Sequence, residues 1–175
     1  GWGTLVRHAA SRFGCTSTGV TLSAEGAKWC NAKNEEEDLT DRANILYMDY
    51  RDIPTENKYD GIASIEMAEH VGLKNFQVYL GKVRTMLKDD ASFLMQVAGL
   101  RQGSNWEDVA WGLFMGHYIF PGADASTPLN WYIRQVERAG FEVQSIETIG
   151  RHYSHTLLRW YRNWLSNRDE MSKTY

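Results

Sequence analysis

The sequence predicts an α/β fold, in which a mainly parallel sheet carries helices on both faces. Strand-like segments alternate along the whole chain with segments that repeat apolar residues at helical spacing. The strand-like segments are short apolar runs, which are typical of parallel strands buried on both faces. With 175 residues, 43% of them hydrophobic, the chain is long enough for one core, so we expect residues 1–175 to form a single domain.

A helix, a strand and a second helix are expected at the start of the chain. The apolar face of the first helix consists of Leu5, Val6, Ala9 and Phe13. Gly14 is expected to end it, because glycine readily adopts the conformation that terminates a helix. Residues 18–22 follow as a strand, and Ser23 suits the N-cap of a helix over residues 24–33. The acidic run 34–38 is expected to be a solvated loop.

Three further strands are expected at residues 45–48, 61–65 and 93–97. The first of these runs into Asp49 and stops before Pro54, which breaks a strand. A helix between the other two is predicted by apolar residues at helical spacing, namely Phe76, Tyr79, Leu80, Val83 and Leu87.

The last third of the chain is expected to contain three helices and a strand. Residues 106–118 look helical and unusually apolar. The next helix has Thr127 as its predicted N-cap and Pro128 at its first position, and Gly140 ends it. A strand is expected over residues 141–146. One face of the final helix, from Tyr153, carries Leu157, Tyr161 and Trp164.

Composition argues against several classes of protein. The net charge of −3 gives no electrostatic reason to expect binding to nucleic acid. Cys15 and Cys30 form no CxxC pair, so the sequence indicates no metal site, and two free thiols are expected. No apolar run reaches the roughly 18 residues of a membrane span. The seven tryptophans suit either a large core or a site for an apolar or cationic ligand.

Ligands of doubly wound sheets bind beyond the carboxyl ends of the strands, so candidate residues are sought there. Gly1 and Gly3 precede the first helix, where glycine lets the backbone approach a ligand and the helix amino terminus favours a carboxylate. Asp49 can accept a hydrogen bond from an exocyclic amine, and Tyr50 can cover an adenine face. A polar turn explains these last two residues equally well.

The densest group of titratable residues follows the strand over 61–65. Just past Ile65 the chain places Glu66, Glu69 and His70. Each residue taken alone has helix capping or solvation as its ordinary role, but a cluster beyond a buried strand indicates function. Gln96 ends the neighbouring strand and can both donate and accept in orienting a ligand.

With these strand ends in order, the chain resembles the cyclopropane-fatty-acid synthase family of methyltransferases. The matching segments are Gly1–Gly3, Gly19–Ser23, Glu66–Gly72, Tyr118–Gly122 and His152–Leu157. They span nearly the whole chain, and their combination is specific although no single segment is. Within the family, the chain looks most like the fungal sphingolipid C9-methyltransferases, as judged from further segments such as Met48–Pro54 and Arg159–Leu165.

The resemblance implies a Rossmann-like class I S-adenosylmethionine methyltransferase fold. Its cofactor contacts would be Gly1, Gly3, Thr21, Leu22, Asp49 and Tyr50. The family's active site holds a bicarbonate ion that serves as base. Glu69 matches the glutamate near that ion and Ile65 the neighbouring strand-end residue, while Gln96 stands where the family has a histidine. The resemblance thus assigns a catalytic group of Glu69, Gln96 and Ile65.

By the same resemblance, the substrate is the sphingoid base of a ceramide or glucosylceramide precursor, which gains a methyl branch at C9. Methyl transfer to an alkene leaves a carbocation, so a base must then remove a proton, and loss from the methylated carbon restores the double bond. A lipid substrate implies a membrane surface as partner, and the endoplasmic reticulum is the expected location of the complete protein. The arginines of the last helix face lipid headgroups or form a solvated face. The oligomeric state is not indicated.

Three alternatives stay open. The nearest is a phospholipid cyclopropane synthase, whose ring product NMR would distinguish. A NAD(P)-binding oxidoreductase is disfavoured because the strand end at Thr21 and Leu22 lacks the acid that holds ribose hydroxyls. The third is a non-catalytic fragment. The chain is expected to be truncated before the first strand, which would precede Gly1, and before the last strand, which would pair with residues 141–146.

Overall fold

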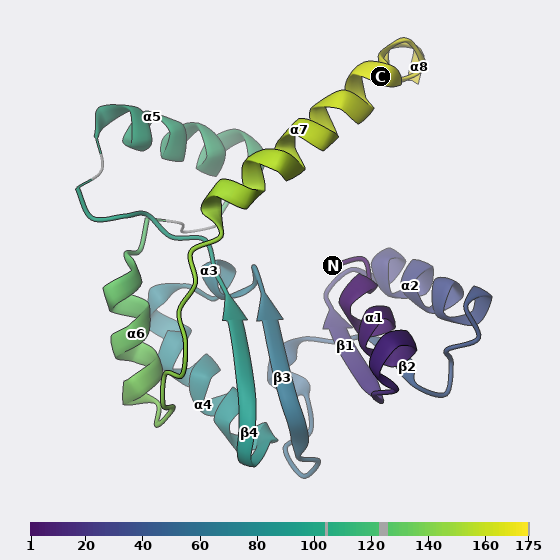
Figure 1. Ribbon diagram of the computed structural model, residues 1–175, viewed down its shortest axis with the longest axis vertical. Helices are drawn as coiled ribbons and strands as arrows, with labels where there is room; N and C mark the ends of the chain where they lie inside the picture. The colour runs from purple at the N-terminus through teal and green to yellow at the C-terminus, as the bar shows by residue number, and fades with distance from the viewer. Residues whose placement is uncertain (104, 123–125, 175) are drawn as a thin grey trace. The chain divides into compact units, whose positions relative to one another are not determined.

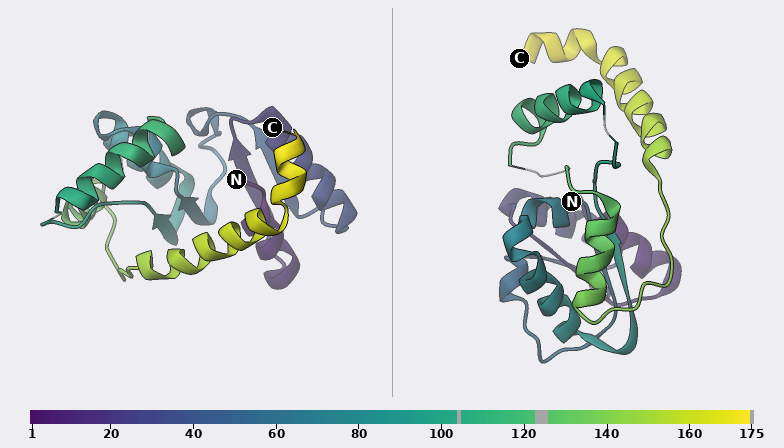
Figure 2. Two further views of the ribbon diagram at one scale, coloured as in Figure 1. Left: turned by 90° about the horizontal axis from the view of Figure 1, so that it is seen from above. Right: turned by 90° about the vertical axis from the view of Figure 1, so that its left-hand side faces the viewer.

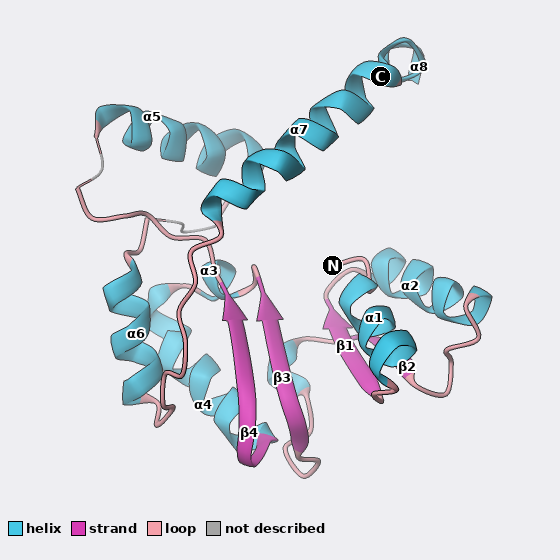
Figure 3. Ribbon diagram, viewed as in Figure 1, coloured by secondary structure: helices cyan, strands magenta, loops and turns pink. Residues whose placement is uncertain are grey.

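Helices and strands alternate along the chain as the sequence predicts (Figures 1 and 3). A computed structural model of the protein describes residues 1–103, 105–122 and 126–174 and divides into two compact units, Gly1–Phe141 and Glu142–Tyr175. The first unit contains α1 (Thr4–Phe13), β1 (Ser17–Thr21), α2 (Ala24–Glu36), β2 (Ala43–Tyr47), η1 (Tyr50–Asp52), β3 (Tyr59–Ile65), α3 (Ala68–Val71), η2 (Leu73–Asn75), α4 (Phe76–Met86), β4 (Leu87–Gln96), α5 (Trp106–Phe114), η3 (Met115–Ile119) and α6 (Leu129–Arg138). The second contains α7 (Gly150–Ser166) and α8 (Arg168–Thr174).

Strands β1 and β2 form one parallel pair, in register along both strands. Helices α1 and α2 pack against this pair, and a small apolar cluster joins α1, α2 and β2: Val6, Ala27, Cys30 and Ile45. The predicted cap of α2 is confirmed, since the Ser23 hydroxyl accepts a hydrogen bond from the Gly26 N–H at 3.0 Å. The predicted end of α1 is confirmed as well, with Gly14 as its C-cap.

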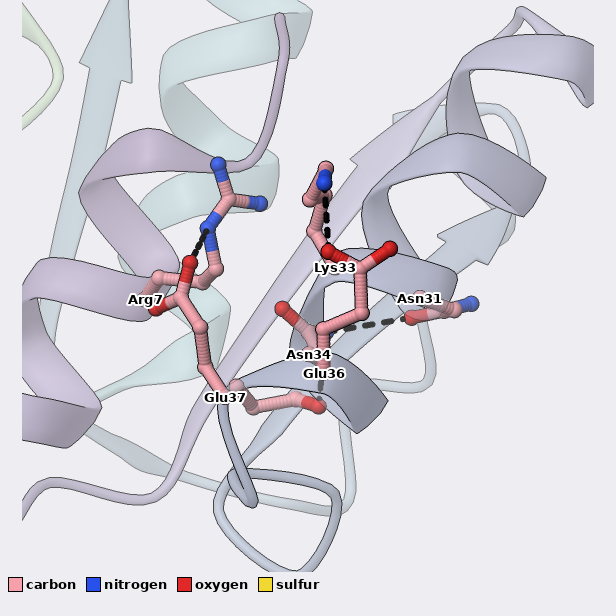
Figure 4. A network of polar contacts seen from close by, with 7 residues as sticks. Arg7, Asn31, Lys33, Asn34, Glu36 and Glu37 are labelled. Atoms are coloured by element: carbon pink, nitrogen blue, oxygen red, sulfur yellow. Dashed lines mark hydrogen bonds and ion pairs between the residues drawn. The ribbon is translucent and has the colours of Figure 1, made fainter.

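Helix α2 runs to Glu36, so the prediction of a solvated loop over residues 34–38 is wrong at its start. Asn34 is 1% exposed, and its side-chain amide donates to the Ala43 carbonyl at 2.9 Å. Asn31 donates to the Ile45 carbonyl at 2.8 Å and accepts from the Ile45 N–H at 2.9 Å. The two asparagines lie near one another (Figure 4), with 3.3 Å between their side-chain nitrogen and oxygen. Burial of Asn34 therefore follows from its contact with β2.

Strands β3 and β4 form a second parallel pair, with an irregularity between Tyr59 and Gly61. Helix α4 packs on one face of this pair and α6 packs on α4, around a core made of Ala68, Phe76, Tyr79, Leu80, Val83, Leu87 and Tyr132. On the opposite face, Ile65 is 42% and Leu94 is 60% exposed. Within the described residues these strands are therefore buried on one face only, whereas the apolar runs predicted burial on both.

Three boundaries differ from the sequence prediction. Leu87 was expected on the helix before it but is the first residue of β4. The apolar helix over 106–118 divides into the α-helix α5 and the π-helix η3. Helix α6 begins at Leu129 with Pro128 at the cap position, so the prediction of Thr127 as its N-cap is wrong. Helix ends are specified by one or two side chains, which makes them harder to locate than the apolar repeat within the helix.

The predicted strand over residues 141–146 is absent, and residues 141–149 have no regular secondary structure. A strand exists only where a neighbouring strand accepts and donates its backbone hydrogen bonds. Among the strands that the structure describes, none pairs with this segment. The apolar pattern indicates an extended segment, but it does not specify a neighbouring strand that would pair with it.

The second unit consists of α7 and the short α8, which follow one another near the carboxyl terminus (Figure 2). Helix α7 begins at Gly150, three residues before the predicted start at Tyr153. Its predicted apolar face is exposed, with Leu157, Tyr161 and Trp164 at 45%, 57% and 47%. No helix in the described ranges has the length and apolar character needed to cross a bilayer.

Candidate active site

The strands of the first unit bring the predicted site residues to their carboxyl ends. Strands β1, β3 and β4 point in the same direction (Figure 1), although among the described residues β1–β2 and β3–β4 are two separate two-stranded sheets. The end of β1 is joined to the segment after β2 by a hydrogen bond of 3.0 Å from the Met48 N–H to the Thr21 carbonyl. Ile65 and Gln96 end β3 and β4 and face each other in the register. The carboxyl end of the β1–β2 pair therefore carries predicted cofactor residues, and that of the β3–β4 pair carries predicted catalytic residues.

Gly3 lies directly before α1 in the left-handed region, with φ of 71°. A Cβ atom at this position would lie 2.9 Å from Nη1 of Arg7 and 3.1 Å from Sγ of Cys30. The thiol of Cys30 also faces the Gly1 carbonyl, 3.8 Å away. Only glycine fits this backbone without strain, and its bare backbone leaves room for a ligand to approach.

Thr21 and Leu22 form the turn between β1 and α2. The Thr21 hydroxyl accepts a hydrogen bond from the Ser23 N–H at 3.2 Å, which fixes the turn. Leu22 is 71% exposed. An exposed apolar side chain at a strand end can contact a ligand, and the resemblance places the cofactor against this residue.

Asp49 is already engaged within its own turn. Its carboxylate accepts from the Arg51 backbone N–H and Nε, both at 2.9 Å, and from Arg51 Nη2 at 2.6 Å. The hydrogen bonds from the Arg51 side chain, followed by that from its backbone, lower the pKa of Asp49 to about 2. The carboxylate is therefore ionised at neutral pH, and a ligand amine would share it with the guanidinium.

Tyr50 links the predicted cofactor residues to the core beneath β3. Its ring meets the ring of Tyr79 edge to face, with centroids 5.7 Å apart. Tyr79 lies on α4 and is 1% exposed. Burial raises the pKa of Tyr79 to about 12. The nearby Ser64 hydroxyl partly opposes this rise. The two hydroxyls do not lie in hydrogen-bonding geometry. Electrostatic interactions with Tyr50 and Glu69 contribute to the same rise in the pKa of Tyr79.

Glu69 lies on the single turn of α3 and is 7% exposed. Its Oε2 atom is buried and has no hydrogen-bond partner among the described residues, and the same holds for the hydroxyls of Ser64 and Tyr79. Buried polar atoms are normally paired, so three unpaired atoms contributed by β3, α3 and α4 are unusual. Such atoms can bind a proton or a small polar group without breaking an existing contact.

Gln96 is directed to Glu66 rather than to Glu69. Its amide donates to Oε1 of Glu66 at 3.1 Å, and the Gln96 carbonyl accepts from the Glu66 N–H at 2.9 Å. Glu66 has φ of 50°, a conformation that costs a residue with a Cβ about 1–2 kcal/mol. Strain of this kind collects at functional sites. A bicarbonate ion at the position implied by the resemblance would therefore compete with Glu66 for the amide of Gln96.

The structure brings together Ile65, Gln96 and the turn that leads to Glu69, and separately joins Thr21 to the Asp49 turn. Sequence reasoning gave no role to Ser64 or Tyr79. Ser64 was detectable as the one hydroxyl inside an apolar strand. Tyr79 was assigned to the core from its helical spacing, which says nothing about where its hydroxyl points.

Comparisons with known proteins show the family and the fold of this chain. A family model described as mycolic acid cyclopropane synthetase matches residues 1–175. The chain belongs to this family. The fold agrees with it: the cyclopropane synthase MmaA2 from Mycobacterium tuberculosis superimposes with a TM-score of 0.85 at 23% identity, covering 97% of this chain and 62% of that one. The predicted class I S-adenosylmethionine methyltransferase fold is thereby confirmed.

Two fungal members of the family are closely similar in sequence. Sphingolipid C9-methyltransferase 2 of Gibberella zeae is 49% identical over 177 residues, covering 100% of this chain and 34% of that protein. Sphingolipid C9-methyltransferase of Komagataella phaffii is 50% identical over 183 residues, covering 100% of this chain and 37% of that protein. The chain thus spans about a third of the length of these relatives.

Proposed function

We propose that the protein of which this chain is part is an S-adenosylmethionine-dependent C-methyltransferase that modifies C9 of the sphingoid base in a ceramide or glucosylceramide precursor. Membership of the family and the two relatives named sphingolipid C9-methyltransferases support this proposal. A ceramide-type substrate resides in a bilayer, so the proposal includes membrane association of the complete protein, with the endoplasmic reticulum as the expected membrane.

The described residues fit the cofactor. S-adenosylmethionine, when bound, supplies an electrophilic methyl group. Gly3 leaves backbone free where a side chain would collide with Arg7 and Cys30. The exposed Leu22 offers an apolar contact, and the ionised carboxylate of Asp49 offers a hydrogen-bond acceptor. These residues would hold and orient the cofactor, because positioning alone supplies roughly 7–11 kcal/mol in such reactions.

Glu69 is proposed to serve the removal of a proton. Addition of a methyl group to one alkene carbon leaves positive charge on the other. Loss of a proton from the methylated carbon then returns its bonding electrons to the double bond and leaves a methyl branch. A buried carboxylate with one oxygen free of hydrogen bonds can accept that proton and also stabilises the cation before it. No step is assigned to bicarbonate, because the amide of Gln96 is engaged by Glu66.

The apolar segment formed by α5 and η3 is the proposed contact for the lipid chain. Trp111 stacks on Phe114 with centroids 5.5 Å apart, and Phe114 lies 5.2 Å from Tyr118. These rings are 60%, 43% and 68% exposed. Exposed apolar surface of this extent marks a binding surface rather than a core. An aromatic face near the cation contributes about 0.5–2 kcal/mol.

The observation that carries the proposal is the buried Oε2 atom of Glu69, just past the end of β3, which has no hydrogen-bond partner among the described residues. Glu69→Gln in the complete protein keeps the shape of the side chain but removes its charge. We expect lipid methylation to fall by about 100-fold or more, since general bases contribute about that factor, while calorimetry shows unchanged cofactor affinity. The measurement is transfer of labelled methyl from the cofactor to separated lipid classes.

The matched control is Glu25→Gln, which alters an exposed glutamate on α2 and should leave methylation unchanged. Full methylation by the Glu69→Gln protein would remove Glu69 from the mechanism. NMR of the product tests the reaction itself, because a cyclopropane ring abolishes the alkene signals and a methyl branch retains one of them. A ring would replace the proposed activity with that of a cyclopropane synthase.

A further inference from the structure

Two hydroxyl groups are buried near Glu69 and are not used by the fold. Ser64 on β3 is 6% exposed, and Tyr79 on α4 is 1% exposed. Neither hydroxyl has a hydrogen-bond partner in the part of the chain that the structure describes. Burial of an unpaired hydroxyl destabilises a protein, and alanine and phenylalanine would fill the same positions without that cost. Packing therefore does not explain why serine and tyrosine occupy these positions.

The ring of Tyr79 is held in place by three other rings. Its centroid lies 5.6 Å from that of Phe76, 5.7 Å from that of Tyr50 and 6.5 Å from that of Phe93. These neighbours come from α4, η1 and β4. Because the ring is packed against side chains from separate elements, its hydroxyl is fixed in position.

Glu69 and Ser64 lie in the same part of the core as Tyr79. Helix α3 packs on α4, and Ala68, which precedes Glu69, belongs to the core that contains Tyr79. Ser64 shares a face of β3 with Ile62, which packs against that core, because alternate residues of a strand point the same way. Both Glu69 and the Ser64 hydroxyl also affect the pKa of Tyr79. The three unpaired atoms therefore form one buried polar group.

A hydroxyl can support a carboxyl group in both of its protonation states. An ionised carboxylate only accepts hydrogen bonds, whereas a protonated carboxyl also needs an acceptor for its own hydrogen. A hydroxyl becomes a donor or an acceptor by rotating its hydrogen, while an ammonium or guanidinium group only donates. Hydroxyls therefore suit a side chain that takes up a proton in each turnover, because no heavy atom has to be exchanged.

We propose that Tyr79 and Ser64 are positioning residues for the proton transfer to Glu69. The C–H bond of the methylated carbon breaks, its electron pair returns to the double bond, and the proton binds Oε2 of Glu69. The new O–H group donates to the Tyr79 hydroxyl, which donates in turn to Ser64. Rotation of the Glu69 side chain toward Tyr79 breaks no hydrogen bond of Oε2, which has none within the described ranges. Both hydroxyls act through Glu69, so their role rests on the proposed function.

The test is Tyr79→Phe in the complete protein, which removes one oxygen and keeps the ring. We expect kcat for lipid methylation to fall by about 10-fold, which is the effect of one hydrogen bond. The KM for cofactor and for lipid should change by less than about two-fold, because neither touches Tyr79. Tm should stay the same or rise, because an unpaired hydroxyl leaves the core. Ser64→Ala should lower kcat by a smaller factor, since Ser64 supports Glu69 through Tyr79.

The matched control is Tyr132→Phe, which removes the same oxygen from the same core. The Tyr132 hydroxyl donates to the Ala98 carbonyl at 3.5 Å. This substitution should leave kcat unchanged.

Combining Tyr79→Phe with Glu69→Gln separates a positioning role from a structural one. We expect the double variant to be as active as Glu69→Gln alone, because a residue that acts through Glu69 has nothing further to lose. Losses that multiply, a kcat for Tyr79→Phe equal to that of Tyr132→Phe, or a Tm lowered by Tyr79→Phe would each overturn the positioning role and leave that of Glu69 intact. Full methylation by Glu69→Gln alone would instead overturn the proposed function itself, so the two failures are distinguishable.

Discussion

At the residue scale, the backbone of Gly3 is the most demanding feature of the cofactor side. Gly3→Ala adds a Cβ that would meet Arg7 Nη1 at 2.9 Å and that occupies a left-handed conformation. We expect the free energy of unfolding to fall by about 1–2 kcal/mol and cofactor affinity to fall with it. Urea denaturation and calorimetry measure the two effects. The matched control is Gly81→Ala on α4, where nothing lies within 4 Å of the added atom; equal effects in both variants would contradict the argument.

The ion pair of Asp49 and Arg51 gives a pH-dependent contribution to stability. The pKa of Asp49 is lowered from 3.8 to about 2, so its contribution is fully present above pH 3.8 and is lost as the pH falls toward 2. Asp49→Asn keeps a cap for η1 but cannot ionise. The difference in Tm between the two proteins should be constant from pH 5 to 7 and should shrink below about pH 4. A difference that instead changes between pH 5 and 7 would show that another group is responsible.

At the same scale, the positions of the candidate residues could be predicted from the sequence, but their contacts could not. Ile65, Glu69 and Gln96 could be found because each follows or ends an apolar run, and strand ends have a known place in the fold. The hydrogen-bond partners of these residues could not be predicted from the sequence. That Gln96 pairs with Glu66 depends on the left-handed backbone of Glu66, which no pattern of residue types specifies.

At the scale of elements, the outer edge of β2 is protected by side chains of α2. The hydrogen bonds between β1 and β2 begin and end at Arg42 and Met48, so the backbone groups of Ala43 and Ile45 point away from β1. Asn34 and Asn31 hydrogen bond to these groups. An unprotected edge strand is a template for aggregation. The two asparagines thus replace a neighbouring strand.

Asn31→Ala should remove this protection from Ile45. The free energy of unfolding should fall by about 1–3 kcal/mol, because one N–H and one carbonyl lose their partners. Light scattering should also show faster aggregation on mild heating. The control Asn44→Ala changes an exposed residue of β2 itself and should alter stability by less than about 0.5 kcal/mol. A control that aggregates as fast as the variant would mean that the edge is not the cause.

The same helix shows why element boundaries were harder to predict than elements. The acidic run after Lys33 looks like a loop from composition alone, but Asn34 continues the helix because its amide reaches Ala43. Leu87 fits the apolar repeat of α4 equally well as a helix residue or a strand residue. In both cases a contact with a residue distant in sequence determines where the helix ends, and the local spacing of apolar residues does not specify that contact.

At the scale of the whole molecule, the two groups of the candidate site meet through one ring contact in the first unit. Thr21 is tied to Met48, and Tyr50, two residues later, touches Tyr79 beside Glu69. This order of contacts follows from the parallel arrangement of the strands, which the alternation of elements predicted. It links residues separated by 48 positions, from Thr21 to Glu69, as the proposed reaction requires.

The first residues of the second unit give the last prediction. Residues 142–149 lack regular structure, and within the described ranges none of their backbone N–H groups donates a hydrogen bond. Hydrogen exchange in the full chain should therefore label this segment about as fast as an unfolded peptide, whereas the amides of α4 should stay protected. A strand at an edge protects every second amide. Alternating protection over residues 142–146 would show that the strand expected from the sequence forms, and that a partner for it exists.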